Sequence, residues 1–120
     1  MDRDERTKLY IRAIRNWGEE AQTNMVNEEC GELITAIAQF KRGRTSHHDV
    51  MTELADVAIM VEQLATIMSY SDFEQEKDRK LERLRERLDK HEAKLAAAKE
   101  KEDSNGSVAF DDEWSGTMGG

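Results

Sequence analysis

The order of apolar and polar positions predicts helices along most of this 120-residue chain. Apolar residues recur in steps of three and four through residues 4–17, 25–41 and 47–69, which is the spacing of one face of a helix. The chain contains no proline, the residue that most strongly breaks a helix. We therefore expect an all-α protein.

Local signals predict where these helices end. Gly18 follows the first segment and Gly43 follows the second, and glycine commonly ends a helix. We interpret the sequence GEEAQTN, residues 18–24, as a loop or short turn. Ser46 stands three residues before Asp49, a spacing typical of the capping box that starts a helix.

A fourth predicted helix, residues 72–101, is densely charged. Its apolar seam is typical of a coiled coil or a bundle helix. The seam consists of Leu81, Leu84, Leu88, His91, Leu95 and Ala98. We expect a four-helix bundle whose last helix is long and charged.

The length suits one domain, which we place at residues 1–101. Residues 102–120 are rich in glycine, serine and acids without a helical period, so we expect a flexible tail. Val108, Phe110 and Trp114 in this tail could dock on a partner or on the domain.

The formal net charge of −8 argues against general affinity for nucleic acid, which is bound through basic surfaces. Most of the net negative charge lies in residues 1–73, which carry 8 basic and 13 acidic side chains. The single cysteine, Cys30, allows no intrachain disulfide. Neither a membrane span nor a signal-peptide core is evident, so we expect a soluble cytoplasmic protein.

The second predicted helix concentrates Glu28, Glu29 and Glu32 beside the face that it must bury. At about 100° per residue, Glu29 lies at the edge of the apolar face, Glu32 further round and Glu28 furthest out. A solvated acidic flank is an alternative interpretation for this helix.

The third predicted helix places Glu53 and Asp56 within its apolar stripe. An isolated buried carboxylate is costly, so it usually takes up a proton, pairs with a cation or binds a metal. A buried salt bridge to Arg12 or Arg15 is the structural alternative.

Glu29-x-x-Glu32 and Glu53-x-x-Asp56 share one spacing, so two packed helices could aim four carboxylates at one point. Ligands made only of oxygen favour Mg²⁺ or Mn²⁺ over zinc, which prefers cysteine and histidine. No histidine stands three residues after a glutamate, as a ferritin-type di-iron site requires. Mg²⁺ held by carboxylates keeps positions for water and phosphates, which indicates metal-assisted phosphate chemistry.

Glu28-Glu29-x-x-Glu32, followed after 20 residues by Glu53-x-x-Asp56, resembles the EExxE…ExxD signature of the MazG-like all-α nucleoside triphosphate pyrophosphohydrolases. The resemblance covers about residues 8–90 and includes the sequence WGEEAQ upstream of the motif. In these features the chain resembles the compact members of the family that phages and bacteria encode.

This resemblance implies hydrolysis of a (deoxy)nucleoside triphosphate to the monophosphate and pyrophosphate, as nucleotide-pool housekeeping. It implies that Glu28 orients water or a neighbouring group, and that four acids bind Mg²⁺, for which Mn²⁺ could substitute. These four are Glu29, Glu32, Glu53 and Asp56. Sites in the family are often completed across subunits, so we expect a homo-oligomer, a dimer or a tetramer.

Several other residues could bind the substrate. Lys41, Arg42 and Arg44 could clamp the β- and γ-phosphates, or could simply be cations at a helix C-terminus. Lys77 and Lys80 are further phosphate candidates, although a solvated face explains them too. Trp17 could stack on the base and Gln22 could hydrogen-bond to it, while core packing is the alternative for Trp17. We interpret His47 and His48 as part of an exposed first turn.

The competing hypothesis is a non-catalytic helical interaction module that pairs through its C-terminal leucine seam. In that case the acids are structural. Glu53 and Asp56 discriminate between the two hypotheses, because an interaction module has no need of two acids on its apolar stripe.

Overall fold

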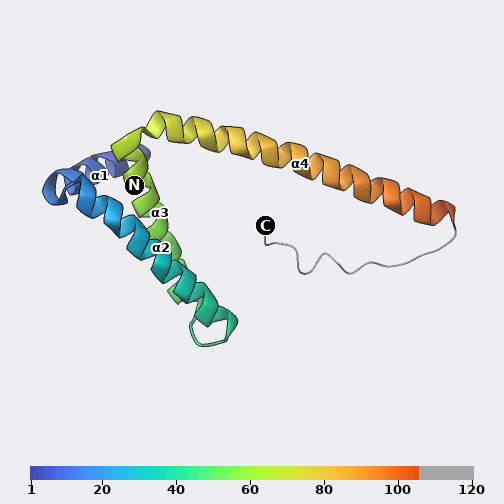
Figure 1. Cartoon of the computed structure of the whole chain (residues 1–120), viewed down its shortest axis with the longest axis horizontal. Helices are drawn as coiled ribbons and strands as arrows, with labels where there is room; N and C mark the ends of the chain where they lie inside the picture. Colours follow the sequence, from blue (N-terminus) through green and yellow to red (C-terminus); the bar gives the residue numbers. More distant parts are fainter. Residues whose placement is uncertain (106–120) are drawn as a thin grey trace. The chain divides into compact units, whose positions relative to one another are not determined.

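The computed structural model describes residues 1–105, which form four α-helices and no strand (Figure 1). The helices are α1 (Arg3–Trp17), α2 (Glu19–Lys41), α3 (His47–Met68) and α4 (Tyr70–Ser104). The predicted all-α class is therefore confirmed. Within the described range no helix has the length and apolar character needed to cross a membrane. Val108, Phe110 and Trp114 lie outside the described residues.

Helix α2 begins earlier than the sequence pattern predicts. The loop expected over residues 18–24 is wrong beyond its first residue, because the helix starts at Glu19. Gly18, with φ at 91°, is the only residue between α1 and α2. Glu19 and Glu20 then occupy the first turn, where negative charge complements the helix dipole. Helix α4 also extends past the predicted range and includes Glu102–Ser104, which we had assigned to the tail.

The connector between α2 and α3 is a short, well-defined turn. Gly43 adopts φ of 70°, its N–H donates to Phe40 O at 2.9 Å, and Arg44 N–H donates to Gln39 O at 2.9 Å. These bonds form a Schellman motif at the end of α2. The predicted capping box starts α3: Ser46 Oγ accepts from Asp49 N–H at 3.1 Å, and Asp49 accepts from Ser46 N–H at 2.9 Å.

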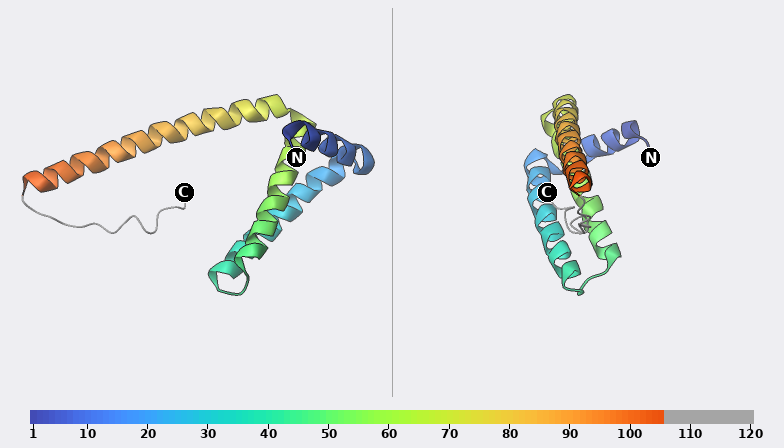
Figure 2. Two further views of the ribbon diagram at one scale, coloured as in Figure 1. Left: turned by 180° about the vertical axis from the view of Figure 1, so that it is seen from behind. Right: turned by 90° about the vertical axis from the view of Figure 1, so that its right-hand side faces the viewer.

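Met1–Glu76 form one compact unit, in which α2 and α3 lie side by side as an antiparallel hairpin (Figures 1 and 2). Helix α1 packs mainly against α3, and also contacts α2. The guanidinium of Arg3 lies 4.3 Å from the ring centroid of Tyr70, so a cation–π contact attaches the first turn of α4 to this unit. The second unit begins at Lys77 and contains the rest of α4.

The three-helix unit has a small core. Its buried apolar residues are Tyr10, Ala36 and Ala65, and no large side chain of the described residues is less than 2% exposed. Gln22 and Gln63 are also buried, at 5% and 6% exposure. Large apolar side chains of all three helices are exposed, including Trp17, Ile34, Phe40, Leu54, Ile59 and Met68. Much of the apolar surface that normally stabilises a fold therefore remains in contact with solvent.

Gly43→Ala should destabilise the chain, because a Cβ strains the left-handed conformation of this residue. No atom lies within 4 Å of the Cβ position, so the effect comes from the backbone conformation alone. We expect a loss of about 1–2 kcal/mol in urea unfolding at fixed protein concentration. Gly31→Ala is the matched control, since Gly31 lies in the helical interior of α2, also with open space, and should gain about 0.5–1 kcal/mol. Equal effects of the two substitutions would contradict this interpretation.

Candidate metal centre

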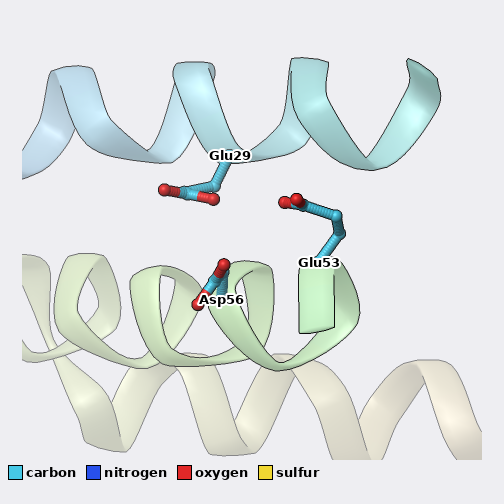
Figure 3. A group of neighbouring side chains, drawn as sticks. All are labelled: Glu29, Glu53 and Asp56. Atoms are coloured by element: carbon cyan, nitrogen blue, oxygen red, sulfur yellow. The ribbon is translucent and has the colours of Figure 1, made fainter. Parts of the chain in front are cut away.

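Three carboxylates converge between α2 and α3. Glu29 extends from α2, while Glu53 and Asp56 extend from α3 toward it (Figure 3). One carboxylate oxygen from each residue lies within 4.8 Å of the other two, and all three side chains are half-buried. This spacing allows a single cation to contact all three residues.

The local sequence explains why the acids meet. Glu53 and Asp56 are three residues apart, so both side chains leave α3 on the same face, one turn apart. The hairpin then brings Glu29 of α2 opposite them. The short capped turn between the helices fixes their ends, and the small buried residue Ala36 lies two turns beyond Glu29 on α2.

The cluster is electrostatically unfavourable without a cation. Glu29 Oε2 and Glu53 Oε2 are buried and have no hydrogen-bond partner. Burial raises the pKa of Glu29 above its ordinary value, and the negative charges of Glu32 and Asp56 raise it further. Burial likewise raises the pKa of Glu53, with added contributions from Glu32 and Asp56. Glu29 and Glu53 are therefore harder to ionise than isolated glutamates.

These directions argue against the salt-bridge interpretation. A cationic partner lowers the pKa of a carboxylate, whereas the pKa values of Glu29 and Glu53 are raised. Arg12, one of the two proposed partners, instead lines a pocket formed mainly by α1 residues, with Ile59 and Gln63 of α3.

An open pocket of about 670 Å³ adjoins the cluster. Its acidic lining residues are Glu28, Glu32, Asp49 and Glu53, and Thr35 and Thr45 add hydroxyl groups. Glu32, which we expected to be a metal ligand, lines this pocket and is not one of the three clustered residues. Its charge nevertheless acts on Glu29 and Glu53. The pocket therefore offers space beside the three carboxylates for a polar molecule.

The remaining predicted residues lie in different environments. Lys41 ends α2 and Arg44 lies in the connector, both exposed. Trp17 is 69% exposed and lines the pocket that also contains Arg12. Gln22 is buried in the first turns of α2. Lys77 begins the second unit. The structure therefore brings three of the motif acids together, and neither Trp17 nor Gln22 lines the pocket beside them.

The sequence analysis missed a polar group between α1 and α3. Tyr10 donates a hydrogen bond to Glu62 Oε2, and Arg6 Nε lies 3.7 Å from the same oxygen. Burial, followed by the hydrogen bond to Glu62, raises the pKa of Tyr10 to about 12. Gln63 Oε1 is buried nearby without a partner. The polar pair Glu62-Gln63 within the otherwise apolar end of α3 was the available signal.

Comparison with known proteins adds no further constraint. No family model matches the chain, and no curated protein or solved structure matches it. The functional assignment therefore depends on the geometry of the cluster and on the resemblance of its motif.

The residues present fit a hard divalent cation. Mg²⁺ and Mn²⁺ prefer carboxylate oxygens, and Glu29, Glu53 and Asp56 supply them on two helices. Glu29 Oε2 and Glu53 Oε2, both buried and without a hydrogen-bond donor, support this fit, because buried polar atoms in proteins almost always have a partner. A cation between the helices would provide that partner.

Glu53→Gln should raise the melting temperature in the presence of chelator, because it removes one of the mutually repelling charges. The raised pKa of Glu53 means that the wild type loses stability as pH rises above the ordinary value of 4.5 and through the folded-state pKa. The advantage of the variant should therefore be largest at neutral pH and shrink as pH falls toward 4.5. Added Mg²⁺ should stabilise the wild type more than the variant.

Glu62→Gln is the matched control, since it makes the same chemical change on the same helix. Glu62 accepts a hydrogen bond from Tyr10 and pairs with Arg6, so its variant should melt lower than wild type. Thermal melts with chelator and with Mg²⁺ compare the two. A Glu53 variant that also melts lower in chelator would favour a structural salt bridge over a metal site.

Proposed function

We propose that this protein is a Mg²⁺-dependent pyrophosphohydrolase that converts (deoxy)nucleoside triphosphates to the monophosphate and pyrophosphate. The observation that carries the proposal is the convergence of Glu29, Glu53 and Asp56 within 4.8 Å, with two buried oxygens unpartnered. The resemblance of these residues to the motif of the MazG-like enzymes supports the same reaction class. Mn²⁺ is a plausible substitute because it accepts the same ligands.

Each acid has a distinct task in this proposal. Glu29, Glu53 and Asp56 would hold Mg²⁺ between the helices, and Glu32 would complete the anionic wall beside them. Bound Mg²⁺ supplies charge neutralisation for a polyphosphate and lowers the pKa of water. Glu28 lines the same pocket, from which it can orient water as the resemblance implies.

The acidic surface of the pocket makes metal binding a requirement for substrate binding. Four carboxylate residues line it, and a triphosphate would be repelled by them unless a cation reversed the local charge. Lys41 at the end of α2 and Arg44 in the connector that follows are the candidates for contacting the β- and γ-phosphates.

The direct test is a panel of ribo- and deoxyribonucleoside triphosphates incubated with Mg²⁺, with all products resolved by chromatography. We expect pyrophosphate and the monophosphate in equal amounts, and no turnover in chelator. Release of orthophosphate and a diphosphate would contradict the proposed reaction, because it shows cleavage at the γ-phosphate.

Glu29→Gln should cause a large loss of turnover. The loss should exceed the roughly 10- to 100-fold loss that is typical when a residue hydrogen-bonded to a metal ligand is replaced. The physical reason is the loss of one of three anionic ligands. Glu20→Gln, on an exposed position in the first turn of the same helix, is the matched control and should leave turnover unchanged. Equal activity of the Glu29 variant and wild type would exclude the cluster as the catalytic centre.

The proposal includes a homo-oligomer formed by the three-helix unit. The core consists of one tyrosine and two alanines, while Ile34 is 69% exposed and Ile59 is 43% exposed. A second copy that covers such side chains would supply the apolar burial that the single unit lacks.

Ile34→Lys should therefore weaken self-association at least about tenfold, since it removes an apolar contact and adds a charge. Sedimentation velocity over a range of protein concentrations measures the change. Asn24→Lys adds the same charge at an exposed position elsewhere on α2 and should have no effect. A wild-type chain that stays monomeric at high concentration would refute the oligomer.

The alternative, an interaction module, is favoured by a different part of the chain. Leu81, Leu84 and Leu88 of α4 are about half exposed, at 54%, 48% and 47%. This observation indicates a binding partner for α4, and does not explain the acids between α2 and α3. The two properties are compatible in one protein.

A further inference from the structure

Helix α4 carries an exposed leucine seam with an uneven charge distribution on its two sides. In heptad notation the a positions are Leu81, Leu88 and Leu95, and the d positions are Leu84, His91 and Ala98. The four leucines are 40–54% exposed, and no residue of α4 is buried. The seam is therefore available to another helix.

The flank next to the seam on the g side is entirely basic. Each g position immediately precedes an a position. The g residues are Lys80, Arg87, Lys94 and Lys101. The e side, by contrast, is mixed in charge. Its residues are Asp78, Arg85, Glu92 and Lys99. Charges at e and g decide which helices pair and in which direction, so this pattern carries information about the partner.

A second copy of α4 is a poor partner in the antiparallel direction. In that arrangement g positions face g positions, so one basic flank would lie directly against the other. Like charges at facing positions are unfavourable.

The parallel direction is little better. There each g residue faces the e residue five positions later on the other helix. Arg87 would meet Glu92, which is attractive. The other two contacts are repulsive, since Lys80 would meet Arg85 and Lys94 would meet Lys99.

An anionic membrane surface is also disfavoured. A helix lying on a membrane brings both of its flanks close to the headgroups, and the outer face of α4 includes acids on the side away from the basic flank. Asp78 and Glu92 at the e positions, and Glu82 and Asp89 at the b positions beside them, would be repelled there. A single partner helix, by contrast, faces only the seam and the e and g positions.

We propose that the seam of α4 binds an amphipathic helix of a different protein, one with leucines along its own seam and glutamates along the flank that faces the basic g residues. The leucines supply the apolar burial, and the charge complementarity selects this partner over a second copy. This site is independent of the acidic cluster and goes beyond the proposed hydrolysis.

Two synthetic 28-residue helical peptides test the proposal with the full chain. Both carry leucine at a and d; the acidic probe has glutamate at e and g, and the basic probe has lysine there. Fluorescence anisotropy should show binding of the acidic probe at least about tenfold tighter than the basic probe at low salt, with the difference reduced in high salt. Similar affinities, or no binding of either probe, would overturn the proposal.

Reversing charges at selected positions of α4 identifies the face of the helix that binds the acidic probe. Arg87→Glu combined with Lys94→Glu should weaken binding of the acidic probe about tenfold or more. Arg83→Glu combined with Lys90→Glu makes the same change at outward c positions and should have little effect. Equal losses in the two double variants would show that net charge alone governs binding, and would overturn the proposal.

Leu88→Ser tests the seam itself and should abolish binding of the acidic probe without changing the oligomeric state of the chain. A change in oligomeric state on this substitution would show that a second copy occupies the seam. Binding of phosphatidylserine vesicles that blocks the acidic probe and that Leu88→Ser abolishes would show that lipid occupies it. Either result overturns the proposal.

Discussion

The repulsion among three carboxylates held between two helices is the constraint on which the functional interpretation depends. Packing alone gives no reason to place Glu29 and Glu53 beside Asp56, since burial and the nearby charges of Glu32 and Asp56 raise the pKa of both glutamates. The hairpin of α2 and α3 nevertheless keeps their oxygens within 4.8 Å. A bound divalent cation would convert this repulsion into a bridge between the two helices, as the proposed function requires.

Periodicity predicted the helices well because helix formation depends on residues close in sequence. The stops at Gly18 and Gly43 and the start at Ser46 were all predicted, since each is determined by local backbone geometry. The loop expected over residues 18–24 was wrong because a single glycine, Gly18, is enough to turn the chain, and helix α2 begins at Glu19. Gln22 is in fact buried.

The sequence predicts which helix face carries each acid of the candidate site. It does not predict which of these acids lie close together. The spacing of Glu53 and Asp56 places both on one side of α3 in any helix. Whether Glu29 or Glu32 lies opposite them depends on the register between α2 and α3, which no local pattern encodes. The same limit applies to Gln63 and to the bond between Tyr10 and Glu62, because both depend on how α1 crosses α3.

The central claim is that Glu29, Glu53 and Asp56 bind a divalent cation. The most direct measurement is a crystal structure of the chain soaked in Mn²⁺, with the ion located by its anomalous scattering. We expect a peak between α2 and α3, bonded to oxygens of all three residues at about 2.0–2.3 Å. A peak at another place, or ordered carboxylates paired with arginine and no peak between them, would contradict it.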